Sequence, residues 1–136
     1  PQPLTLTAGI SGPGVNGTPL AIRSMARTLV GDDVTIDEEA TIGGQPAKLK
    51  VFLHTEPRGN SELQVFSDWD VSVPVAGGPR GPIRLVKRLS TTTLLRPGEQ
   101  VSVAEVDLAG WGGKGVLRLW LRGDWGHAAP GLTSAR

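Results

Sequence analysis

Alternation of apolar and polar side chains over residues 63–75 is the strongest pattern in the chain. Every odd position in this run is apolar except Ser67, and most even positions are polar. Because successive side chains of a β-strand point to opposite faces, the spacing predicts a strand with one stripe against a core and one in water. At about 3.3 Å per residue the strand would extend roughly 40 Å, which is long and is typical of a sandwich-spanning strand or an assembly interface.

Shorter alternating or β-prone runs occupy most of the remaining chain, between turns rich in Gly and Pro. The further predicted strands are residues 3–8, 33–36, 40–42, 47–55, 83–89, 91–95, 101–108 and 116–122. A one-residue change of phase near Ala104 and Glu105 predicts a β-bulge. Residues 9–17 are predicted as a loop because they are rich in Gly.

One segment carries helix signals. Thr18 can cap a helix, Pro19 suits a first helical position, and Gly31 stands where a C-cap belongs. Between them, apolar residues follow at helical spacing: Ile22, Met25, Ala26 and Leu29. A strand with Arg23 and Arg27 facing outward fits the same residues, but the caps favour one short helix near residues 19–30.

These elements predict an all-β fold. We expect an antiparallel β-sandwich, Ig-like or jelly-roll-like, with about eight strands and the one helix. The length of 136 residues predicts a single domain over residues 1–136. Residues 126–136 are predicted as a flexible tail.

The composition excludes several classes of protein. Without cysteine, disulfides, thiol catalysis and thiolate metal sites are excluded. No apolar run approaches the ~20 residues of a membrane-spanning helix. The chain begins at Pro1 rather than Met, which fits a removed signal peptide or an excised domain. We expect an extracytoplasmic protein or a component of a virion.

Charge is divided unevenly along the chain. Residues 1–68 hold 5 Lys or Arg against 8 Asp or Glu, whereas residues 69–136 hold 9 against 5. The basic residues include a predicted patch: Arg80, Arg84, Lys87, Arg88 and Arg96. This layout suits head-to-tail self-association or an acidic partner, and a solvated basic sheet face is the alternative. The net charge of +1 gives no bulk attraction to nucleic acid, which we do not expect as a partner.

Tryptophan and arginine alternate near the C-terminus and form a candidate interaction surface. Arg118, Trp120 and Arg122 share one face of a predicted strand, and Trp111 and Trp125 lie nearby in the sequence. Tryptophan beside arginine can stack on sugars, bases or a partner's cations. The alternative is that neighbouring strands cover Trp120.

Few residues are candidates for metal binding or catalysis. Asp37, Glu38 and Glu39 form a predicted acidic tip between two short strands, which could bind Ca²⁺ or could be a simple acidic loop. The carboxylates of Asp68 and Asp70 share a strand face and could act as an acid–base pair, although a solvated stripe is the commoner role. His54 and His127 are too far apart in the sequence to indicate a catalytic centre. We expect the protein not to be an enzyme and not to bind a cofactor.

Two further features concern recognition by other proteins. Arg122, Gly123 and Asp124 spell the tripeptide that integrins read on exposed turns, and a chance occurrence is the alternative. The first predicted strand could complete the sheet of a neighbouring molecule, or it could pair within its own domain.

Together these observations favour a non-catalytic structural or assembly module. It would act by protein–protein contacts, with a partner or by self-association, in a larger particle or surface array. Possible settings are a virion, a capsid protrusion, a tail protein, a pilus or a surface layer. The alternative is a periplasmic or secreted Ig-like binding or chaperone module, or a carbohydrate-binding module, that uses the Trp/Arg surface.

Overall fold

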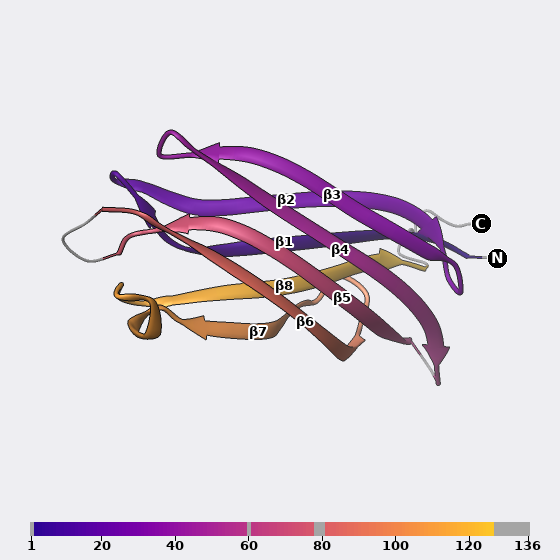
Figure 1. The fold of residues 1–136 in the computed structure, drawn as a ribbon. Helices are drawn as coiled ribbons and strands as arrows, with labels where there is room; N and C mark the ends of the chain where they lie inside the picture. The colour runs from indigo at the N-terminus through magenta and orange to yellow at the C-terminus, as the bar shows by residue number, and fades with distance from the viewer. Residues whose placement is uncertain (1, 60, 78–80, 127–136) are drawn as a thin grey trace.

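Two antiparallel sheets of four strands pack face to face in a computed structural model, which describes residues 2–59, 61–77 and 81–126 (Figure 1). One sheet has the order β2-β1-β8-β7 and the other β3-β4-β5-β6. The strands are β1 (Pro3–Val15), β2 (Thr18–Leu29), β3 (Asp33–Ile42), β4 (Gln45–Arg58), β5 (Glu62–Val75), β6 (Ile83–Leu95), β7 (Gln100–Asp107) and β8 (Val116–Trp125). A short 3₁₀ helix, η1 (Leu108–Trp111), follows β7. The predicted eight-stranded antiparallel sandwich is confirmed.

The strands are connected in an up-and-down order. β1 and β2 form a hairpin, β3 to β6 form a meander in the second sheet, and β7 and β8 return to the first sheet beside β1. β2 also lies beside β3, and β6 beside β7, at the two sides of the sandwich. Ig and jelly-roll sandwiches contain Greek-key connections. The connectivity therefore differs from both predicted types.

The long amphipathic run forms the central strand β5, whose odd positions are buried against the other sheet. Ser67, the polar exception in that stripe, has a structural reason. The buried Trp69 indole donates a hydrogen bond from Nε1 to Ser67 Oγ at 2.9 Å, and Ser67 Oγ lies 2.8 Å from Thr91 Oγ1. A buried indole N–H without an acceptor would destabilise the fold, and Ser67 supplies that acceptor.

The predicted helix near residues 19–30 is wrong, because this segment is the edge strand β2. Leu20 and Ile22 are buried and Arg23 and Arg27 are exposed, as in the rejected strand interpretation. The pairing of β2 with β1 along most of both strands outweighs the local capping signals. The predicted loop 9–17 is also wrong, since β1 continues to Val15.

Other boundaries shift in the same direction, towards longer strands. The predicted acidic tip lies within the continuous strand β3, and β6 joins the two predicted strands 83–89 and 91–95. The predicted bulge is confirmed, with a register shift between Ser102 and Ala104 in the pairing of β7 with β8. His127 and the rest of the predicted tail from residue 127 onward, like Arg80, lie outside the described residues.

Candidate binding face on the outer side of the second sheet

The predicted Trp/Arg surface is not an exposed aromatic face in the structure. Arg118 and Arg122 point outward from β8 and are exposed, but Trp120 between them exposes only 8% of its surface. The Trp120 indole lies over Gly9, its partner on β1, where a Cβ atom would overlap the ring. Trp120 therefore packs over the β1 backbone on the outer side of its own sheet.

The remaining members of that surface are distributed over different parts of the fold. Trp125 is buried on the inner side of the sheet, and Trp111 in η1 packs partly buried against the core. The Arg118 guanidinium forms an ion pair with Glu105 at 2.9 Å. The five residues therefore do not form one contiguous platform.

The integrin-like tripeptide lies within a paired strand. Gly123 is buried and is the partner of Leu6 on β1. The flanking side chains of Arg122 and Asp124 form an ion pair with each other at 3.1 Å. An integrin reads this tripeptide on an exposed turn, and the structure provides no turn here.

The three residues of the acidic metal candidate do not gather on one side of their strand. Asp37, Glu38 and Glu39 are consecutive strand residues, so Glu38 points to the opposite side of β3 from the other two. Glu39 forms an ion pair with Lys48 at 3.5 Å. Across the described part of the chain, no group of three or more His, Asp or Glu side chains could hold a metal ion.

The predicted basic patch is divided between two sides of β6. Arg84 and Arg88 point outward, and Arg96 follows the strand on the same side. Lys87 lies at an inward-facing position but is exposed, because β6 is an edge strand. An inward-facing charge on an edge strand discourages pairing with another molecule.

The outer side of the β3-β4-β5-β6 sheet, here called the outer face, gathers charged residues that are distant in the sequence. The sign of the charge alternates from strand to strand. Acids lie on β3 (Asp33, Asp37, Glu39) and on β5 (Glu62, Asp68, Asp70). Basic residues lie on β4 (Lys48, Lys50, Arg58, beside the acid Glu56) and on or just after β6 (Arg84, Arg88, Arg96).

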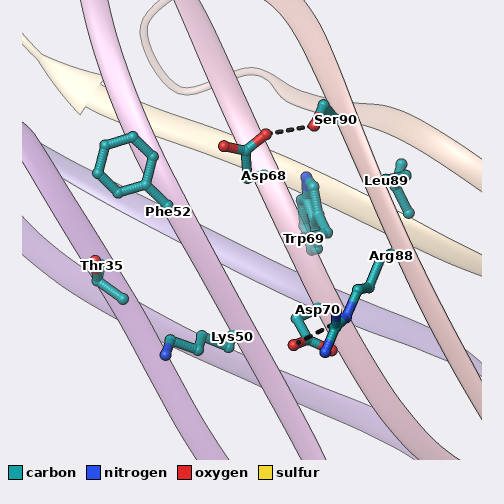
Figure 2. Close-up of a pocket in the computed structure, with 9 residues that line it drawn as sticks. All are labelled: Thr35, Lys50, Phe52, Asp68, Trp69, Asp70, Arg88, Leu89 and Ser90. Atoms are coloured by element: carbon teal, nitrogen blue, oxygen red, sulfur yellow. Dashed lines mark hydrogen bonds and ion pairs between the residues drawn. The ribbon is translucent and has the colours of Figure 1, made fainter.

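A shallow depression of about 660 Å³ lies in the middle of the outer face (Figure 2). Its lining residues are Thr35, Lys50, Phe52, Asp68, Trp69, Asp70, Arg88, Leu89 and Ser90. Asp68 accepts a hydrogen bond from the Ser90 hydroxyl, and Asp70 forms an ion pair with Arg88 at 3.5 Å. The two predicted carboxylates thus line the depression, but each is already engaged by a neighbouring strand.

Exposed apolar side chains form a diagonal stripe beside this depression. Phe52 on β4, Phe66 on β5 and Leu94 on β6 expose 40%, 37% and 53% of their surfaces. The cross-strand register places Phe66 opposite His54, so Phe52 and Phe66 are diagonal neighbours. Sequence reasoning missed this apolar stripe, although apolar residues at the outward positions of alternating strands were a readable signal.

His54 lies beside Phe66, the middle residue of the stripe. Its ring lies 5.9 Å from the Phe66 ring, between centroids. Its Nδ1 is 2.5 Å from Asp33 Oδ1, and its Nε2 is 3.1 Å from Glu56 Oε2. The hydrogen bond to Asp33, and to a smaller extent the one to Glu56, raises the pKa of His54 above 6.5, because both carboxylates stabilise the imidazolium.

Comparisons with protein-family models, curated proteins and solved structures find no match for this chain. Within residues 2–59, 61–77 and 81–126, no helix is long and apolar enough to cross a membrane.

Proposed function

We propose that this protein is a non-catalytic assembly module that acts by protein–protein contacts through the outer face. In this proposal it is a component of a larger particle or surface array. The observation that carries the proposal is the stripe of Phe52, Phe66 and Leu94, exposed between rows of charged side chains.

The distribution of exposed apolar side chains supports this choice of face. Among the described residues, four of the six large hydrophobic side chains that are exposed lie on it: Phe52, Phe66, Val86 and Leu94. Protein interfaces typically have an aromatic or aliphatic centre and a polar rim. Exposed phenylalanine also has a cost in water, which burial against a partner would remove.

A carbohydrate-binding module is the second candidate. The covered position of Trp120 argues against the Trp/Arg surface as its binding site, and the depression is the better location. There the Phe52 ring is exposed beside the Asp68 and Asp70 carboxylates, a combination that can pack on a sugar ring and accept hydrogen bonds from its hydroxyls.

Sedimentation velocity, from low to high micromolar concentration, tests the assembly proposal. We expect the protein to associate and the Phe66→Asp variant to remain monomeric, because the substitution would place a charge where the assembly buries the Phe66 ring. Met25→Asp is the matched control, since Met25 exposes 69% of its surface on the outer side of the other sheet. Association that survives Phe66→Asp but is lost in Met25→Asp would place the interface on the β2-β1-β8-β7 sheet and refute the choice of the outer face. A wild-type protein that is monomeric at every concentration would refute self-assembly.

A further inference from the structure

One cross-strand row of the outer face contains a charged residue from each of the four strands, and the sign of the charge alternates along the row. The cross-strand partners are Asp37 on β3, Lys50 on β4, Asp70 on β5 and Arg88 on β6. Within the chain, the row includes the Arg88–Asp70 ion pair at 3.5 Å, and the Arg88 side chain remains 80% exposed. Such an exposed pair contributes little to stability by itself. These charges therefore remain available to an occupant of the face.

We infer that the occupant is a second copy of this chain, packed face to face about a two-fold axis parallel to the strands. This inference rests on the proposed function and identifies its partner. An axis that runs between β4 and β5 places β6 of one copy over β3 of the other, and β5 over β4. In the four-strand row, Arg88 then faces Asp37 of the second copy, and Lys50 faces its Asp70.

The alternative two-fold axis does not produce this complementarity. An axis across the strands would superpose each strand on its own copy, so that the acids of β3 would face each other and the arginines of β6 would do the same. Facing like charges cost free energy and select against that arrangement. The alternation of sign from strand to strand therefore specifies the direction of the axis.

The two phenylalanines fit the same axis. Phe52 lies on β4 and Phe66 lies one row further along on β5, so the two occupy diagonal corners of a square of four positions. Rotation about the axis moves the rings of the second copy to the other two corners, opposite Asp68 and His54. Four rings can then interdigitate without collision, as side chains do between packed sheets.

The size of the face suits a stable dimer. Four strands at about 4.8 Å spacing, with outward side chains along about 40 Å, cover roughly 800 Å² per copy, which is the size of a standard interface. Twisted sheets pack at about 30° to each other. This rotation separates the facing charges most at the ends of the strands and least in the central row that contains Lys50 and Asp70.

Charge reversal tests the arrangement directly. We expect Asp37→Arg and Arg88→Asp each to weaken the dimer by about tenfold or more, because each variant places two like charges opposite each other. An equal mixture of the two variants should recover a dimer of twice the 14.3 kDa chain mass, since Arg at position 37 of one chain then faces Asp at position 88 of the other. Arg118→Asp is the matched control, because Arg118 also pairs across strands but lies on the other sheet.

The outcomes separate this inference from the proposed function. Recovery in the mixture, with Arg118→Asp unchanged, supports the two-fold dimer. A mixture that stays monomeric, single reversals that associate like the wild type, or a mass that grows beyond the dimer would overturn it. If Phe66→Asp still abolishes association in those cases, the proposed function stands and only the two-fold arrangement falls. If the wild type never associates, the two-fold dimer is refuted, and the proposed function would then require a different protein as the partner of the outer face.

Discussion

At the scale of single residues, Gly9 and Trp120 show how one position can be fixed by another that is far away in the sequence. The two are direct partners across β1 and β8, and the indole covers the glycine backbone on the outer side of the sheet. An aromatic ring over a glycine replaces the packing that the missing side chain would provide. The sequence revealed the alternation that includes Trp120, but the identity of its partner depends on strand pairing.

We predict that Gly9→Ala destabilises the fold by about 1–3 kcal/mol, because the new methyl group would displace the Trp120 ring from a well-packed site. Urea denaturation gives the change in the free energy of unfolding. In a Trp120→Ala background the same substitution should be nearly neutral, since the obstruction is gone. Equal costs in the two backgrounds would show that Trp120 does not restrict position 9.

His54 supports a prediction on pH. Its pKa is raised in the folded protein, so the imidazolium stabilises the fold below about pH 6.5, and this contribution is lost as the pH rises through the folded pKa. An NMR titration should find the His54 pKa above 6.5 in the wild type. Asp33→Asn should lower it more than Glu56→Gln does, because the hydrogen bond to Asp33 is the larger cause. A His54 pKa that is unchanged by Asp33→Asn would contradict this account.

At the scale of elements, β2 shows where local sequence signals and long-range pairing disagree. Thr18, Pro19 and Gly31 all suit the ends of a helix, yet the segment between them forms a strand with Leu20 and Ile22 in the core. A turn signal that opposes the helix was also present. Asn16 and Gly17 have φ values of 53° and 74°, the left-handed conformation of a tight hairpin turn that Asn-Gly favours. The hairpin determines the pairing, and the pairing determines the strand.

At this scale, most errors of the sequence-based prediction concern where the strands begin and end. The alternation over residues 47–55, 63–75 and 116–122 identified three strands, because each has a continuous inner stripe. Edge strands are less constrained on their inner side, so Glu38 on β3 and Lys87 on β6 occupy inward positions and interrupt the pattern. Because Glu38 interrupts the apolar inner positions of β3, its sequence resembles two short strands around an acidic tip.

At the scale of the whole molecule, the candidate site depends on sheet order, which alternation alone does not specify. Each outward charge could be assigned to its own strand from the sequence. The opposition of Asp37 and Arg88 at the two edges of one sheet follows only once β3-β4-β5-β6 is the order. The apolar stripe has the same origin, since Phe52, Phe66 and Leu94 are neighbours only across strands.

Amide hydrogen exchange should distinguish association through the outer face from association through strand edges. Edge pairing would add backbone hydrogen bonds, so alternate amides of an exposed edge strand such as β2 or β7 would become protected when the protein is concentrated. Packing through the outer face buries side chains and adds no backbone pairing. We therefore predict that the protection of the edge strands β2 and β7 is the same in dilute and concentrated protein, whereas outer-face side chains become shielded. Methyl and aromatic NMR signals of Leu94 and Phe66 should shift with concentration, and those of Met25 on the other sheet should not. New protection along β2 or β7, with unchanged Phe66 signals, would assign association to strand addition instead.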